Sequence, residues 1–73
     1  MPVDRFEIVV RGRLSPNLVT ALDGFEVSHC TGGLTHLVGP VPDQAKMHGL
    51  FRILSNLNIE LVSVNPVGEV ALD

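Results

Sequence analysis

The sequence has one cysteine, no tryptophan or tyrosine, few basic residues and no long hydrophobic run. The single cysteine, Cys30, excludes an internal disulfide framework and is typical of a reducing compartment. No apolar run approaches the ~20 residues of a membrane span, and residues 1–7 carry charge where a leader would be apolar. We therefore expect a cytoplasmic protein that does not bind membranes.

Positive charge is also scarce. Five Lys and Arg stand against eight Asp and Glu, and the formal net charge of -3 has the wrong sign for a surface that follows a phosphate backbone. Arg5, Arg11 and Arg13 are the only basic cluster, and three phenylalanines offer few rings for base stacking. Nucleic acid is not an expected partner.

The chain is short, with 73 residues of which 45% are hydrophobic. This length allows one domain, near the lower limit of what folds without disulfides or metal. Self-association buries further surface in such small domains, so we expect a homo-oligomer.

The first part of the chain predicts a strand and then a short helix. Phe6, Ile8 and Val10 alternate with Arg5, Glu7 and Arg11, which is the period-two pattern of a strand with one buried face, and Val9 is the apolar exception on the polar side. Ser15 then precedes Pro16. This pair favours a helix start, because serine can accept from the unpaired N–H groups and proline lacks a donor that the first turn does not use.

A Gly-Gly pair at residues 32–33 separates two further predicted strands. Two glycines tolerate the positive φ angles of a two-residue hairpin turn. This register places Val27 opposite Val38 and His29 opposite His36.

A longer helix and a last strand complete the predicted elements. The run Gly39-Pro40-Val41-Pro42 is expected to end the third strand at Val38, because it cannot continue a central ladder. Asp43 predicts the cap of a helix that continues to about Asn56, and Asn58 is expected to stop it in a left-handed conformation. The last apolar strand follows.

The predicted order is βαββαβ, an α+β ferredoxin-like sandwich with a four-stranded antiparallel sheet in the order 4-1-3-2 and two helices on one face. One domain spans residues 1–73, with a core of about 5–66 and a loosely held tail at 67–73. The predicted strands are residues 5–14, 25–31, 34–38 and 59–64, and the helices are 16–22 and 43–56.

Two helices on one face leave the other face of the sheet uncovered. Val9, Leu37, Val62 and Val64 are expected to form an apolar patch there, and an exposed apolar patch marks a partner surface. These four residues are our predicted oligomer interface.

In its order of elements the folded span resembles the small ferredoxin-like domains typified by ACT regulatory modules, and short uncharacterised bacterial proteins of similar size. The resemblance implies pairing of domains through the sheet. It also implies a small effector bound near the first strand-to-helix turn, here Gly12-Arg13-Leu14-Ser15-Pro16-Asn17. This fold carries many unrelated activities, so the function must be argued from sites.

His29, Cys30 and His36 are the only cluster of soft or borderline metal ligands. Across the predicted turn the two imidazoles stand opposite each other, with about 5 Å between their Cβ atoms. A closed zinc site takes four ligands, so the others would have to come from His48, Asp43 or a neighbouring subunit. We therefore expect no resident metal or cofactor, and a cross-strand pair of half-exposed histidines.

The start of the second helix holds the densest run of polar residues. Asp43 is the cap, and Gln44 and His48 lie four residues apart. Together with Arg52 they predict a site for an anion or a partner's carboxylate beside the N–H groups of the first turn, although a capped helix without a ligand gives the same pattern.

The second predicted helix also contains two small residues. Gly49 inside a helix costs about 1 kcal/mol relative to alanine, so we expect Ala45 and Gly49 to pack closely against the sheet or another subunit. Arg11 and Arg13 are candidates for binding a carboxylate or phosphate, and Glu7 and Glu26 are their expected neighbours.

No catalytic set is recognisable in the sequence, so catalysis by this chain alone is not expected. The leading prediction is a non-enzymatic, homo-oligomeric binding or regulatory module, with a protein partner or small effector to be identified. The first alternative is an ACT-like effector-binding domain. The second is a small metal protein or enzyme that uses His29, His36 and His48.

Overall fold

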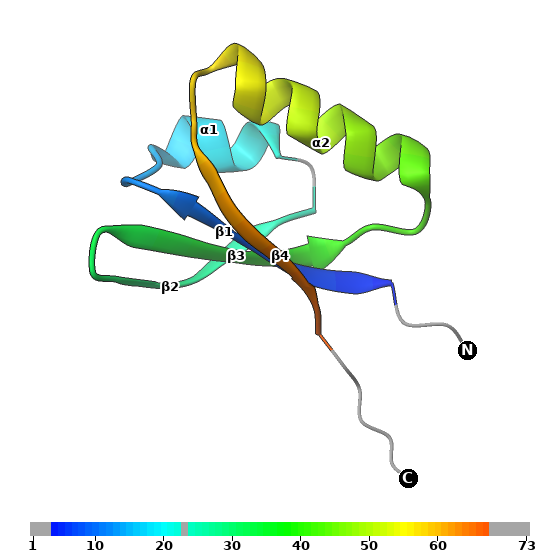
Figure 1. Ribbon diagram of the computed structural model, residues 1–73, viewed down its shortest axis with the longest axis horizontal. Helices are drawn as coiled ribbons and strands as arrows, with labels where there is room; N and C mark the ends of the chain where they lie inside the picture. The colour runs from blue at the N-terminus through cyan, green and yellow to red at the C-terminus, as the bar shows by residue number, and fades with distance from the viewer. Residues whose placement is uncertain (1–3, 23, 68–73) are drawn as a thin grey trace, which may run out of the picture.

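The computed structural model describes residues 4–22 and 24–67. These residues form β1 (Arg5–Arg11), α1 (Pro16–Ala21), β2 (Glu26–Thr31), β3 (Leu34–Pro40), α2 (Gln44–Asn56) and β4 (Leu61–Pro66). The sheet has the order β2-β3-β1-β4 with antiparallel pairing throughout, and both helices lie on the same side of it (Figure 1). The predicted ferredoxin-like α+β sandwich and its strand order are confirmed.

The helix boundaries follow from the residues predicted to set them. Ser15 Oγ accepts from the Leu18 N–H at 3.2 Å and begins α1, while Asp43 Oδ1 accepts from the Lys46 N–H at 2.9 Å and begins α2. Asn58 has a φ of 57°, so it forms the predicted left-handed stop after α2. Neither helix is long and apolar enough to cross a membrane.

The core lies between the helices and one face of the sheet. A close contact fixes its edge: a Cβ atom added at Gly39 would lie 2.6 Å from Phe25 Cγ and 2.8 Å from the Gly24 carbonyl oxygen. The aromatic ring therefore needs a glycine beneath it. The buried apolar residues of this core are Ile8, Val10, Leu22, Phe25, Leu37, Val41, Leu50 and Leu54.

The hairpin register differs from the prediction at one end. His29 pairs with His36 as predicted, but Val27 pairs with Leu37 because a bulge at Ser28 adds one residue to β2. The predicted pairing of Val27 with Val38 is wrong.

The bounds of three strands also differ from the prediction. β1 ends at Arg11, three residues before the expected Leu14, because its pairing with β3 ends opposite Leu34 at the hairpin turn. β3 continues to Pro40. The ladder between β2 and β3 ends at the pair of Glu26 and Val38, so beyond Val38 the strand β3 pairs only with β1 and tolerates a proline there. β4 begins at Leu61 and ends at Pro66, two residues later than expected at each end. Its late start follows from the end of α2, where the Ile59 N–H still bonds to the Leu54 carbonyl.

The predicted interface residues do not form one surface. Directly opposed residues share a face, and the buried core residue Ile8 pairs with both Leu37 and Val64, so these two side chains point toward the helices. Val9 lies on the open face, whereas Val62 is the additional residue of a bulge in β4 and is 41% exposed. The placement of Leu37 and Val64 on the open face was wrong because the pattern of alternation was read in the wrong phase.

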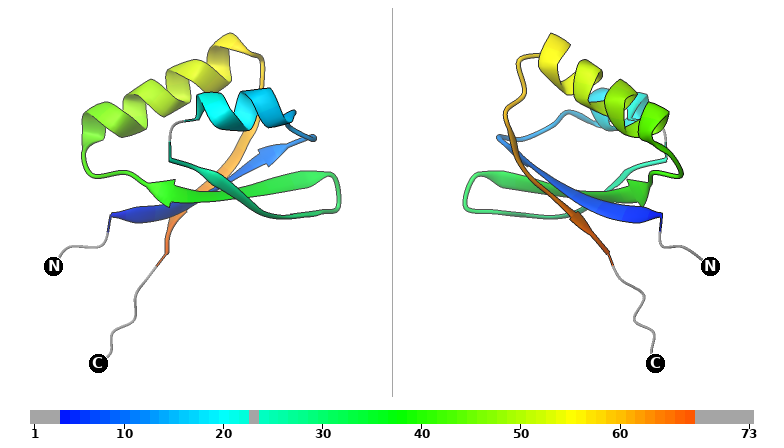
Figure 2. Two further views of the ribbon diagram at one scale, coloured as in Figure 1. Left: turned by 180° about the vertical axis from the view of Figure 1, so that it is seen from behind. Right: turned by 45° about the vertical axis from the view of Figure 1, so that its right-hand side comes forward.

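The chain stays paired at the end of β4, where the Val67 N–H donates to the Arg5 carbonyl at 2.9 Å. The rest of the predicted tail, residues 68–73, lies outside the described residues. Figure 2 shows from two further sides that the helices cover one face of the sheet and leave the opposite face open.

Candidate functional site on the open sheet face

A straight row of four residues crosses the open face, one from each strand. His29 on β2 pairs with His36 on β3, His36 pairs with Val9 on β1, and Val9 pairs with Ser63 on β4. Opposed residues share a face, so the four side chains lie in one line. We call His29, His36, Val9 and Ser63 the central row.

A row of different character lies on each side of the central row. On one side Val38 pairs with Glu26 and with Glu7, and Glu7 pairs with Asn65; we call Glu26, Val38, Glu7 and Asn65 the acidic row. On the other side Leu34 pairs with Thr31 and with Arg11, and these three residues form the basic row. The open face thus carries carboxylates at one end and, at the other, an arginine whose Nε is ion-paired with Glu60.

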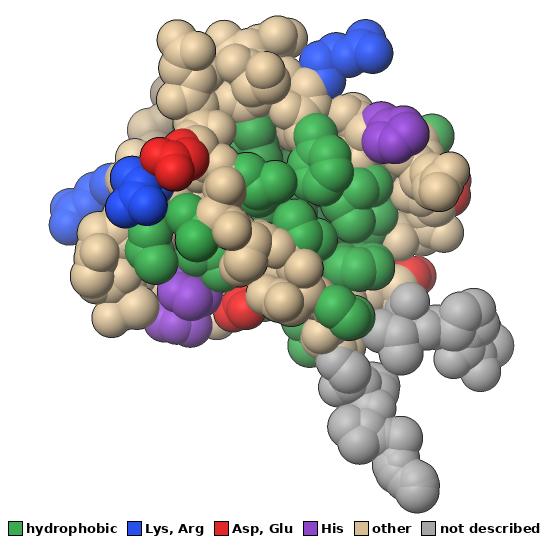
Figure 3. Space-filling view, viewed as in Figure 1, with side chains coloured by type: hydrophobic (Ala, Val, Ile, Leu, Met, Phe, Trp, Pro, Cys, Tyr) green, Lys and Arg blue, Asp and Glu red, His purple; other side chains and the backbone are tan. Residues whose placement is uncertain are grey.

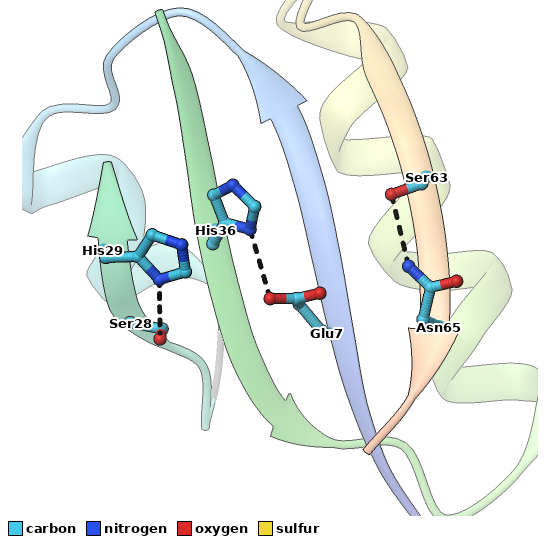
Figure 4. Close-up of polar contacts among 6 residues, drawn as sticks. All are labelled: Glu7, Ser28, His29, His36, Ser63 and Asn65. Atoms are coloured by element: carbon cyan, nitrogen blue, oxygen red, sulfur yellow. Dashed lines mark hydrogen bonds and ion pairs between the residues drawn. The ribbon is translucent and has the colours of Figure 1, made fainter. Parts of the chain in front are cut away.

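The two histidines of the central row are stacked. Their ring centroids lie 4.0 Å apart and their planes differ by 18°. His36 Nδ1 lies 3.1 Å from Glu7 Oε2, and His29 Nδ1 lies 3.1 Å from Ser28 Oγ (Figure 4). The stack therefore has a carboxylate at one end and a hydroxyl at the other.

One atom of this cluster lacks a partner. His36 Nε2 is buried and has no hydrogen-bond partner among the described residues, although its side chain remains 17% exposed overall. A buried polar atom without a partner costs about 1–3 kcal/mol, and a bound group that interacts with it removes that cost. His36 Nε2 is the strongest local indication that the open face binds something.

The structure brings together two of the three histidines considered as metal ligands. His48 lies on α2, on the helix side of the sheet, and Cys30 pairs with the buried core-side Thr35 and so points away from the open face. Within residues 4–22 and 24–67, no group of three or more His, Cys, Asp or Glu side chains could hold a metal ion.

The residues predicted at the start of α2 are exposed. Asp43 is occupied by its capping bond, and Gln44, His48 and Arg52 follow one another at a spacing of four, so they share one side of the helix. These three side chains form a continuous side of α2, but this helix covers the face of the sheet opposite to the one that carries the histidine pair.

The expected close packing of the small residues of α2 against the sheet is wrong. A Cβ atom added at Gly49 would meet no atom within 4 Å. Gly49 and Ala45 instead line a groove of about 300 Å³ between α1 and α2, together with Leu22 and Ile53.

The two candidate arginines lie in different surroundings. Arg11 Nε forms an exposed ion pair with Glu60 Oε1 at 3.0 Å, so the expected neighbours Glu7 and Glu26 are not its partners. The reason is that Glu60 leads into β4, which runs beside this end of β1. Arg13 borders a hollow of about 230 Å³ between the β1–α1 turn and the hairpin tip.

The turn beside this hollow is tied to the hairpin. The Gly12 N–H donates to the Gly33 carbonyl at 2.7 Å, and Thr35 Oγ1 donates to the Gly12 carbonyl at 2.5 Å. Thr35 is only 1% exposed, and its role could not be predicted from the sequence, because a threonine after a Gly-Gly turn carries no distinguishing signal.

Glu7, Leu34 and Val38 were also missed as residues of the open face. Their signal was present in the sequence, because the correctly predicted pairing of His29 with His36 could have been extended across β1 by the same alternation. The apolar part of this face is therefore Val9 with the half-buried Leu34 and Val38.

Comparison with known proteins identifies a family. A family model described as a domain of unknown function (DUF8691) matches residues 5–65, a span that reaches from the start of β1 into β4. Comparisons with curated proteins and with solved structures gave no significant match.

Proposed function

The chain belongs to the DUF8691 family, and because its description assigns no activity we propose from the site that the protein is a non-enzymatic binding module. It associates with a second copy of itself through the open sheet face and acts in the cytoplasm, where the thiol of the exposed Cys30 stays reduced. The observation that carries this proposal is the order of the three rows on that face.

The three rows make the open face complementary to itself. With a two-fold axis in the plane of contact and along the central row, each residue of that row faces its own counterpart. The acidic row then faces the basic row of the other copy. Glu7 lies opposite Arg11 of the partner subunit, and Val38 lies opposite Leu34 of the partner subunit. In this arrangement Glu7, which already contacts His36, meets an arginine that already pairs with Glu60, so the charges extend existing pairs across the contact, and apolar meets apolar.

The expected contact is small. Four strands spaced about 4.8 Å apart and about 20 Å long give a flat face of roughly 400 Å². The two faces together bury roughly 800 Å², and somewhat more once protruding side chains are counted, which is in the range of weak, transient contacts below about 1,200 Å². Val9 adds little exposed area, because it is already 4% exposed in the single copy. We therefore propose a reversible dimer.

Sedimentation equilibrium of matched lysine variants tests this proposal. Val38 lies opposite Glu7 and Glu26, so Val38→Lys finds partners within its own chain while placing a charge in the contact. We expect it to weaken dimerisation roughly tenfold or more. Val27→Lys is the control, because Val27 is 42% exposed but pairs with the core residue Leu37 and so faces the helix side.

Two outcomes would contradict the proposal. One is a wild-type chain that stays monomeric up to the highest concentration measured. The other is an equal effect of Val38→Lys and Val27→Lys when circular dichroism shows both to be folded.

An ACT-like effector-binding role is the second candidate, and the hollow beside Arg13 favours it. The hollow adjoins the first strand-to-helix turn, where the ACT resemblance implies a ligand, and Arg13 offers a positive charge for a small carboxylate. A thermal-shift comparison with amino acids and other small carboxylates should show a rise in Tm that Arg13→Ala abolishes. No rise with any of them would count against this candidate.

A further inference from the structure

The histidine pair on the open face has the chemistry of an incomplete metal site. We infer that two copies of the chain hold one divalent transition-metal ion, of the kind that zinc represents, between their open faces, with His29 and His36 of each copy as the four ligands. This inference rests on the proposed function, because one copy supplies only two imidazoles.

Glu7 prepares His36 as a ligand. Its Oε2 lies 3.1 Å from His36 Nδ1, which favours the tautomer with the proton on Nδ1 and leaves a lone pair on Nε2. Metal-binding histidines are usually oriented by a carboxylate in this way. The Nε2 atom that would bind the ion is the buried atom without a partner. Coordination gives it one.

His29 is the ligand that has to move. The two rings are nearly parallel and 4.0 Å apart, so a single ion cannot lie in both ring planes. His29 is able to turn, because it is exposed, lies on the edge strand β2 and is held by the stack with His36 and by one hydrogen bond between its Nδ1 and the Ser28 hydroxyl. A rotation of this side chain breaks the stack and brings its second nitrogen to the ion.

The two-fold axis supplies the missing ligands. His29 and His36 belong to the central row, which is the part of the face nearest the axis, so each pair meets its own copy there. Four imidazole nitrogens at about 2.0–2.1 Å form a tetrahedral set that zinc accepts. The half-buried Leu34 and Val38 lie on either side of His36 along β3 and keep the site dry. An ion at this place also strengthens a contact that is small.

Sedimentation of the full chain in EDTA and after addition of Zn²⁺ tests the inference. We expect zinc to tighten dimerisation at least tenfold, and calorimetry to give one ion for two chains. His36→Ala and His29→Ala should each abolish the zinc effect. If His36→Ala fails to fold, His29→Ala still tests the site, because His29 is exposed and its replacement leaves the fold intact. His48→Ala is the matched control, since it removes an exposed histidine from the other layer, and Cys30→Ser excludes the thiol.

Two further measurements separate a metal site from a structural effect. Glu7→Gln should weaken zinc binding about 10–100-fold, because an orienting carboxylate is lost, and this loss should exceed any weakening of the dimer that the same variant shows in EDTA. Co²⁺ added in place of Zn²⁺ should give the visible absorption of a tetrahedral site without a thiolate charge-transfer band.

The outcomes distinguish this inference from the proposed function. A dimer that forms in EDTA and does not respond to zinc overturns the metal site and leaves the dimer standing. A monomer with and without zinc overturns both. Zinc binding that survives in His29→Ala and His36→Ala, or that is lost in His48→Ala, overturns the assignment of the ligands.

Discussion

The opposite environments of Gly39 and Gly49 predict opposite effects of the same substitution. In Gly39→Ala the new Cβ atom would lie 2.6 and 2.7 Å from two ring carbons of Phe25, where carbon atoms ordinarily approach to about 3.5–4.0 Å. The ring is 5% exposed in the core and cannot swing out, and the Gly24 carbonyl at 2.8 Å is backbone. Overpacking of this kind should lower the free energy of unfolding by about 1–3 kcal/mol.

Gly49→Ala is the internal control for this effect. Its Cβ atom meets nothing within 4 Å, and alanine is better than glycine inside a helix, so the free energy of unfolding should rise by about 1 kcal/mol. Urea unfolding of the two variants measures both changes, and each kcal/mol corresponds to roughly 4–8 °C in Tm for a domain of this size. Gly39→Ala with wild-type stability, or Gly49→Ala less stable than wild type, would refute the packing described for β3 and α2.

Three further results are expected. Asp43→Ala should cost about 1 kcal/mol in urea unfolding, because the Lys46 N–H loses its cap; an unchanged midpoint would show that the cap contributes nothing. Thr35→Val should cost about 1 kcal/mol, because the Gly12 carbonyl loses its buried donor, and amide exchange should quicken at the Gly12 N–H; unaltered exchange would contradict the link between turn and hairpin. EDTA should leave the far-UV circular dichroism unchanged, because the core lies on the helix side of the sheet, away from the histidine pair; unfolding in EDTA would contradict this.

Local patterns in the sequence sufficed to predict most of the fold. Ser15, Asp43 and Asn58 set helix ends through their own side chains and backbone preferences. These helix ends can therefore be predicted from the few residues around them. The Gly-Gly turn likewise fixed the pairing of His29 with His36, which is the nearest part of the ladder to it.

The pairing of Val27 and the placement of Val62 depended on bulges that no local pattern announces. A bulge at Ser28 moved the partner of Val27 by one residue, and a second bulge lies at Val62 in β4. Because side chains alternate with a period of two, a shift of one residue transfers a side chain to the other face. Leu37 and Val64 were placed on the wrong face for a different reason, the phase in which the alternation was read, even though the strand order was right.

The histidine cluster was only partly predictable for a related reason. The pairing across the turn followed from sequence, but the contact with Glu7 joins residues 29 positions apart on β1 and β3 and needed the register of the whole sheet. Figure 3 shows one side of the molecule on which apolar side chains gather between α2 and β4, so apolar surface is not confined to the open face. The order of the three rows, and not apolar area alone, distinguishes the open face.

Isotope-filtered NOE spectroscopy on a mixture of labelled and unlabelled chains tests the central claim most directly, because it records contacts only between copies. The two-fold arrangement predicts intermolecular NOEs between the methyl groups of Val38 in one copy and those of Leu34 in the other, with Val9 close to its own counterpart. Intermolecular NOEs confined to the α1–α2 groove around Ala45 and Ile53, or none at concentrations where sedimentation detects a dimer, would contradict association through the open face.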